Sequence, residues 1–122
     1  MTTTYLIEPQ LVFADYLQTM LAEAGLRVVA TSDEIDSRDI VAHNPAAIFV
    51  DLDFFVRGGP NALCKIREAS RSAALIAYSN SDDPTYTAAC YISGADAVIS
   101  KRDAEDRVLT TLRNVIASPS GN

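Results

Sequence analysis

Short apolar runs alternate with longer stretches of helical spacing along the whole chain. Five runs are nearly continuous in hydrophobic residues, and most contain Val or Ile, as is typical of strands buried on both faces. They are residues 4–8, 26–30, 46–51, 74–79 and 96–101. Because each run has the length of a strand and is followed by a helical pattern, the alternation predicts a parallel sheet covered by helices.

The stretches between the runs repeat their apolar residues every three or four positions, which indicates amphipathic helices. The predicted helices are residues 11–24, 33–43, 60–69, 84–93 and 104–117. Gly25 and Gly94 follow two of these helices and are natural helix ends. Asp83 is placed to cap the start of the fourth helix. Thr31 and Glu34 fit a capping box at the start of the second.

Strict alternation of strands and helices predicts an α/β fold of the flavodoxin-like doubly wound (βα)5 type. Its five parallel strands are expected in the order 2-1-3-4-5, with right-handed crossovers that place helices on both faces. We assign residues 1–118 to one domain and residues 119–122 to a flexible tail or the start of a linker.

Composition and charge narrow the class of protein. The chain has 122 residues, of which 48% are hydrophobic and 21% charged, enough to bury the core of one domain. Its net charge of -6 disfavours direct nucleic-acid binding, which relies on Lys and Arg. No apolar run approaches the roughly 20 residues that cross a bilayer, and the N-terminus does not resemble a secretory signal. We therefore expect a cytoplasmic domain that binds neither nucleic acid nor membrane.

The cysteines and the histidine offer little for metal or redox chemistry. Cys64 and Cys90 are widely separated, and we interpret them as ordinary helix residues in a reducing compartment. His43 is the only histidine, and no CxxC or HxxxH spacing exists, so a zinc site is not expected. We expect His43 at a helix end, beside the C-terminal dipole and away from any catalytic triad.

Polar side chains end four of the predicted strands. Glu8 ends the first strand, Asp51 the third, Ser79 the fourth and Lys101 the fifth. Ligands bind at the carboxyl ends of strands in open parallel sheets, so these four side chains are expected to converge on one pocket. Each alone is also typical of the start of a loop. Together they combine carboxylates, a hydroxyl donor and a cation.

The chain resembles response-regulator receiver domains over essentially its whole length. The resemblance lies in AAIFVDLDFFVRGG at the third strand, ALIAYSNSDD at the fourth and SGADAVISKRDA at the fifth. It implies that Asp51 accepts a phosphoryl group from a phosphohistidine donor, with Ser79 and Lys101 contacting the phosphoryl oxygens. It also implies Mg²⁺ held by carboxylates, for which the candidates are Glu8, Asp51 and, weakly, Asp53.

The same resemblance implies partners. A histidine kinase or a phosphotransfer protein would supply the phosphoryl group. A downstream protein or a fused output domain would read a conformational shift of the face made by the fourth strand, the fourth helix and the fifth strand. The segment around Lys101 looks closest to receivers that precede helix-turn-helix output domains. The sequence also allows a homodimer, either through the fourth helix, fifth strand and fifth helix or through the first and fifth helices.

Several positions depart from the family pattern. Pro9 stands where a second acid usually follows the first strand, so we expect weakened Mg²⁺ binding. Asn80 replaces a small residue and would either crowd the entrance or hydrogen-bond to Asp51. Val98 replaces the switch aromatic, and Arg102 replaces the proline that usually follows the lysine.

Four residues are candidates for a partner-binding face: Phe55, Arg57, Tyr86 and Tyr91. Phe55 lies in an apolar loop and would either contact a partner or cover the pocket. Arg57 would either neutralise the acceptor aspartate without a metal or be a solvated loop residue. The two tyrosines would either mark a contact face or fill the seam between the fourth helix and the sheet.

These observations favour a signalling receiver domain and not an enzyme that turns over a substrate. In the favoured version the acidic site is degenerate, and the domain acts through protein contacts without phosphate. In the alternative, Asp51 is a conventional Mg²⁺-dependent phosphoswitch that controls a DNA-binding output domain or a partner. A flavodoxin-like ligand-binding protein or enzyme is disfavoured, because EPQLVF has no glycine with which to build a phosphate loop.

Overall fold

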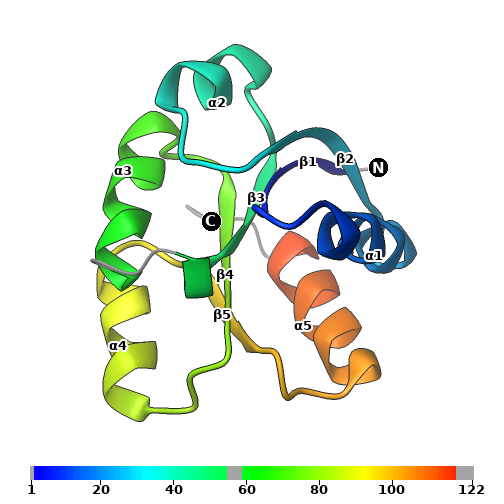
Figure 1. The fold of residues 1–122 in the computed structure, drawn as a ribbon, viewed down its shortest axis with the longest axis vertical. Helices are drawn as coiled ribbons and strands as arrows, with labels where there is room; N and C mark the ends of the chain where they lie inside the picture. The colour runs from blue at the N-terminus through cyan, green and yellow to red at the C-terminus, as the bar shows by residue number, and fades with distance from the viewer. Residues whose placement is uncertain (1, 55–58, 118–122) are drawn as a thin grey trace.

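The structure, a computed structural model, describes residues 2–54 and 59–117 of the chain (Figure 1). The strands are β1 (Thr2–Ile7), β2 (Leu26–Ser32), β3 (Ala47–Asp51), β4 (Ala74–Ser79) and β5 (Ala97–Ser100). The helices are α1 (Leu11–Glu23), α2 (Ser37–His43), α3 (Ala62–Ala69), α4 (Pro84–Ile92) and α5 (Glu105–Ala117), with the 3-10 turns η1 (Leu52–Phe54) and η2 (Gly59–Asn61).

Within the described residues the strands form one parallel sheet in the order β2-β1-β3-β4-β5. Helices α1 and α5 cover one face, and α2, α3 and α4 cover the other (Figure 1). The predicted α/β fold and strand order are therefore confirmed. In this order β1 and β3 are neighbours at the switch point, where ligands bind in open parallel sheets.

Two hydrophobic cores lie on opposite faces of the sheet. Side chains alternate along a strand, so Leu6 and Phe49 belong to the core under α1 and α5. Tyr5 and Ile48, their neighbours in sequence, belong to the core under α2, α3 and α4. The central strands β3 and β4 are buried along their whole length, which explains why their sequences are almost continuously apolar.

The ends of α1 and α4 agree with their sequence signals. The carboxylate of Asp83 accepts a hydrogen bond from the backbone N–H of Thr85 at 2.9 Å and caps α4. Gly25 and Gly94 follow α1 and α4 with φ of +87° and +118°, a backbone region that favours glycine. These three predictions are confirmed.

The predicted start of α2 at residue 33 is wrong. The helix begins at Ser37, and its N-cap is Asp36, whose Oδ1 accepts from the backbone N–H of Asp39 at 3.1 Å. Thr31 lies in β2, where it pairs with Leu6 of β1. The strand continues through Ser32, which pairs with Ile7, so no helical turn follows Thr31 and the predicted capping box does not form.

The other sequence predictions concern the histidine, the two cysteines, membrane spans and the C-terminal tail. His43 ends α2 and precedes the N-terminal end of β3, the opposite edge of the sheet from Asp51, as expected. Cys64 and Cys90 are free cysteines on α3 and α4. None of the described helices is long and apolar enough to cross a membrane. The tail assigned to residues 119–122 lies outside the described residues.

Candidate functional site

The four strand-end residues lie at the carboxyl edge of the sheet, as predicted, but they do not line one pocket: Ser79 lines a cleft with Asp53, whereas Glu8 lines another with Pro9. Glu8 directly follows β1, Asp51 ends β3, Ser79 ends β4 and Lys101 directly follows β5. The pairings of Asp51 with Tyr78 and of Ser79 with Ser100 place these strand ends at one level. Sheet order therefore brings together side chains that are up to 93 positions apart in the sequence (101 minus 8).

Asp51 is enclosed at the centre of this edge, with 0% of its surface exposed. Its Oδ1 accepts a hydrogen bond from the backbone N–H of Asp53 at 3.0 Å, and its Oδ2 lies 2.8 Å from Nζ of Lys101. Burial lowers the pKa of Lys101, but its contacts with Asp51 and Asp53 outweigh that effect and raise the pKa above its usual value. Lys101 is therefore a fixed positive charge beside the buried carboxylate.

Glu8 supplies a second buried carboxyl group. It is 3% exposed, and its Oε2 accepts from the backbone N–H of Gln10 at 3.2 Å. Burial and then the neighbouring Asp51 raise the pKa of Glu8 to about 7. Near neutral pH the site therefore holds the Glu8 carboxyl protonated in a large share of molecules.

Glu8 and Asp51 each present one carboxyl oxygen that could bind a cation. Apart from the ion pair of Asp51 with Lys101, Glu8 Oε1 and Asp51 Oδ2 have no hydrogen-bond partner among the described residues. Mg²⁺ is bound in proteins by one or two carboxylates, with water completing its shell. The donor set fits Mg²⁺ in this minimal form, although the described residues contain no group of three or more ligating side chains.

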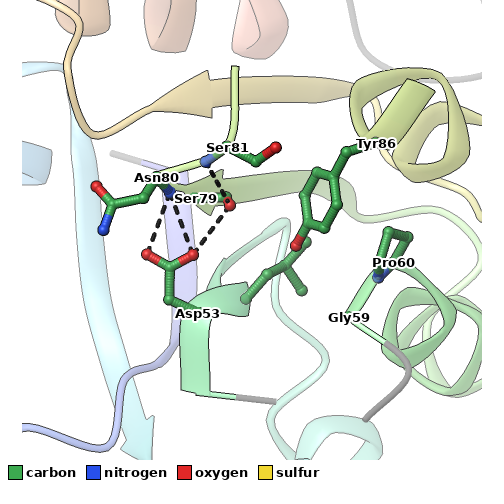
Figure 2. Close-up of a pocket in the computed structure, with 8 residues that line it drawn as sticks. Asp53, Gly59, Pro60, Ser79, Asn80, Ser81 and Tyr86 are labelled. Carbon is green, nitrogen blue, oxygen red and sulfur yellow. Dashed lines mark hydrogen bonds between the residues drawn. The ribbon is translucent and has the colours of Figure 1, made fainter. Parts of the chain in front are cut away.

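The carboxylate of Asp53 faces the donors at the ends of β4 and β5. Its Oδ1 accepts from Oγ of Ser79 at 3.0 Å, and both its oxygens lie 3.1 Å from the backbone N–H of Asn80 (Figure 2). Nζ of Lys101 lies 2.7 Å from its Oδ2. Burial raises the pKa of Asp53, but contacts from Lys101, Asn80 and Ser79 outweigh it, so the pKa lies below its usual value.

Sequence reasoning proposed Asp53 as a weak metal ligand and did not foresee these contacts. The only sequence signal was its position two residues after Asp51. Among the described residues the backbone N–H of Asn80 hydrogen-bonds to Asp53 and not to Asp51. Asn80 lines the cleft, and the alternative that it crowds the entrance stays a prediction. In Figure 2 the Asn80 side chain points away from that carboxylate.

A cleft opens beside this carboxylate. The residues that line it are Leu52, Asp53, Gly59, Pro60, Ser79, Asn80, Ser81 and Tyr86. The ring of Tyr86 stands across the cleft from Asp53 (Figure 2) and packs against the core under α4. A Cβ at Gly59 would lie 3.2 Å from the Tyr86 hydroxyl, so this wall is close-packed.

Of the four partner-face candidates, the structure describes two. Tyr86 fills the seam between α4 and the sheet and also lines the cleft, whereas Tyr91 is 49% exposed on α4. Phe55 and Arg57 lie outside the described residues. The partner roles of all four stay predictions.

Two departures from the expected pattern have clear contacts. Val98, half-buried on β5, packs against the core beneath α2, α3 and α4. Nη1 of Arg102 lies 2.7 Å from Oδ2 of Asp82, and Ser100 Oγ donates to Oδ1 of the same carboxylate at 3.0 Å. These contacts join the loop after β4 to the loop after β5.

Comparison with known proteins gives a consistent result. The family model of the response regulator receiver domain matches residues 5–113. The fold is similar to a LuxR-family DNA-binding response regulator from Staphylococcus aureus, at 18% identity and a TM-score of 0.79, covering 95% of this chain and 99% of that one. It is also similar to a response regulator from Thermotoga maritima, at 19% identity and a TM-score of 0.79, covering 95% and 98%.

A third similar structure is a receiver domain that contains a metal. It comes from a sensor histidine kinase of Pseudomonas aeruginosa and has a magnesium ion coordinated in its active site cleft. The identity is 22% and the TM-score 0.70, covering 95% of this chain and 98% of that one. No curated protein matches the sequence significantly.

Proposed function

The chain belongs to the response regulator receiver domain family, and from this premise we propose that it is an atypical receiver centred on Asp51. In this proposal Asp51 keeps the phosphoacceptor position, its Mg²⁺ site is weakened, and the domain is read by partners without requiring phosphorylation. The observation that carries the proposal is that the buried Glu8, beside the Asp51–Lys101 ion pair of 2.8 Å, is followed by Pro9 and not by a second acid.

The weakened metal site rests on the residue that follows Glu8. Pro9 contributes neither a carboxylate nor a backbone N–H, so within the part of the chain that the structure describes Glu8 and Asp51 are the buried carboxyl groups at this edge. These two residues would hold Mg²⁺, which would offset the negative charge of a transferring phosphoryl group. The raised pKa of Glu8 adds a further cost, because the metal must displace its proton.

Partner contacts are the expected output. The exposed fractions of Tyr91 and Ile92, at 49% and 86%, place two large apolar side chains at the end of α4. Aromatic and aliphatic side chains in such positions are favoured at interfaces. We propose that a downstream protein or a fused output domain binds this end of α4. A histidine kinase or phosphotransfer protein is the expected upstream partner.

The conventional phosphoswitch remains a second candidate, because Asp51, Ser79 and Lys101 are all present and close together. In that reaction a carboxylate oxygen of Asp51 forms a bond to phosphorus while the bond from phosphorus to the donor imidazole nitrogen breaks. The imidazole leaves with its electron pair and takes up a proton. Lys101 and Ser79 would bind the phosphoryl oxygens through charge-assisted hydrogen bonds.

Intact mass after incubation with acetyl phosphate, with and without Mg²⁺, separates the two candidates. The atypical receiver predicts no gain of a phosphoryl group in either condition, or a slow and incomplete one. A rapid Mg²⁺-dependent gain that is absent from Asp51→Asn would establish the conventional switch and overturn the proposal of a degenerate site. A gain retained by Asp51→Asn would reject Asp51 as the acceptor.

A further inference from the structure

Three hydrogen-bond donors from two strand ends converge on the carboxylate of Asp53. They are the Ser79 hydroxyl at 3.0 Å, the backbone N–H of Asn80 at 3.1 Å and Nζ of Lys101 at 2.7 Å. Two of these groups, Ser79 and Lys101, are those that would bind the phosphoryl oxygens if Asp51 were phosphorylated. The donors are therefore already used by an oxyanion that belongs to the chain itself.

The Asp53 carboxylate is also held close to Asp51, the position that would carry a phosphoryl group. Lys101 Nζ lies 2.8 Å from Asp51 Oδ2 and 2.7 Å from Asp53 Oδ2, so one ammonium group bridges the two side chains. The backbone N–H of Asp53 also binds Asp51 Oδ1 at 3.0 Å, which keeps the two residues together. A group attached to an oxygen of Asp51 and paired with Lys101 and Ser79 would meet the Asp53 carboxylate.

We propose that Asp53 is a built-in occupant of the phosphoryl-binding position. Its carboxylate resembles a phosphoryl group in the features that the donors recognise, a negative charge and oxygens that only accept hydrogen bonds. This inference rests on the proposed function, since it assigns the same donors to the phosphoryl group. It names the side chain that holds them in their engaged arrangement without phosphorylation.

A phosphoryl group on Asp51 would compete with the Asp53 carboxylate for the same hydrogen-bond donors. A phosphoryl group bound to Ser79 and Lys101 must take the donors from Asp53, because the single ammonium group of Lys101 cannot neutralise both the Asp53 carboxylate and a phosphoryl dianion. The side chain of Asp53 is 24% exposed, so it has a route outward to solvent. If Asp53 leaves the donors in about one-tenth of molecules, labelling of Asp51 is about tenfold slower than without Asp53.

The test compares the wild-type chain with Asp53→Ala and Asp53→Asn, and with Asp82→Ala as the matched control. The Asp82→Ala variant also removes a contact between an aspartate and a cation in the same region, but the cation is Arg102 and not Lys101. Two readouts are used: the rate of phosphoryl gain from acetyl phosphate with Mg²⁺ by intact mass, and the Asn80 amide signal by ¹H–¹⁵N NMR during titration with inorganic phosphate. A preserved amide spectrum shows that each variant folds.

Asp53→Ala is expected to label about tenfold faster than wild type, with Asp53→Asn between them because its amide oxygen still accepts hydrogen bonds without charge. Inorganic phosphate is expected to shift the Asn80 amide in Asp53→Ala only. Equal Asn80 responses in wild type and Asp53→Ala, or equal and measurable labelling rates, would overturn the inference while leaving Asp51 as acceptor. If phosphate shifts Asn80 only in Asp53→Ala but no variant is labelled, the inference stands and the conventional phosphoswitch fails.

Discussion

Glu8 and Asp51 lie side by side at the carboxyl ends of the neighbouring strands β1 and β3, and both are buried. Burial and the proximity of Asp51 raise the pKa of Glu8 to about 7. When both carboxyl groups are ionised they repel each other, and a proton, a metal ion or a change of side chain can relieve this repulsion. It also gives the stability of the domain a defined dependence on pH.

We predict that Glu8 makes the wild-type domain less stable as pH rises from about 4.5 to about 7, measured without metal. A carboxyl whose pKa is raised on folding binds its proton more tightly in the folded state, so its contribution is present below 4.5 and is lost through about 7. The slope from one group is at most about 1.4 kcal/mol per pH unit.

Urea unfolding in EDTA at several pH values measures this effect. As pH rises, the free energy of unfolding of the wild type should fall relative to that of Glu8→Gln, because glutamine cannot ionise. Glu68→Gln, on the exposed side of α3, should run parallel to wild type. Parallel curves for Glu8→Gln as well would contradict the assignment of the raised pKa to Glu8.

Adding a carboxylate after β1 should strengthen the metal site. We predict that Pro9→Asp lowers the Kd for Mg²⁺ by about tenfold or more relative to Pro9→Ala, which corresponds to roughly 1.4 kcal/mol. Pro9→Ala is the matched control, since it removes the ring without adding a ligand. Isothermal titration calorimetry measures both constants, and equal values would show that Pro9 does not limit Mg²⁺ binding.

Arg67 ties the end of α3 to the turn between α4 and β5. Its guanidinium donates to the carbonyl oxygens of Gly94 at 2.7 Å and Ala73 at 2.8 Å, and to Oδ2 of Asp96 at 2.8 Å. Asp96 Oδ2 in turn accepts from the backbone N–H of Leu75 at 2.9 Å. We predict that Arg67→Ala destabilises the domain by about 2–3 kcal/mol, because it removes donors from several partly buried acceptors at once.

Two further variants make the Arg67 prediction specific. Arg67→Lys should recover little of the loss, since a single ammonium group cannot reach the separate acceptors that the planar fork spans. Arg102→Ala removes an ion pair with Asp82 whose side chains are 72% and 53% exposed, and should cost less than about 1 kcal/mol. Urea midpoints measure all three, and similar losses in Arg67→Ala and Arg102→Ala would refute the ranking.

Gly25 and Gly94 both have positive φ, yet substitution should affect them differently. A Cβ at Gly25 would have nothing within 4 Å, whereas a Cβ at Gly94 would lie 3.2 Å from Cβ and Cγ of Arg67. We predict that Gly25→Ala costs about 1–2 kcal/mol from backbone conformation alone. Gly94→Ala should cost at least about 1 kcal/mol more, because the side chain of Arg67 must also shift. Thermal unfolding compares the two, and equal losses would argue against this contact.

Much of the fold follows from local patterns, and the exceptions have a physical cause. The apolar runs predicted the strands because strands buried on both faces leave no room for polar positions. The start of α2 was mispredicted because β2 continues past Thr31 to Ser32, which pairs with Ile7, so no helical turn begins there. A capping box read from sequence carries no information about where a strand ends.

The sequence by itself determined which chemical groups stand at the carboxyl edge, since Glu8, Asp51, Ser79 and Lys101 each end a recognisable strand. Only the tertiary structure decided which donor meets which carboxylate. Asp53 follows Asp51 by two positions, but its oxygens bind donors that arrive from other strands 26 and 48 residues later (79 minus 53, 101 minus 53). Such contacts depend on sheet order and loop path, because hydrogen bonds require separations near 3 Å that no sequence spacing specifies.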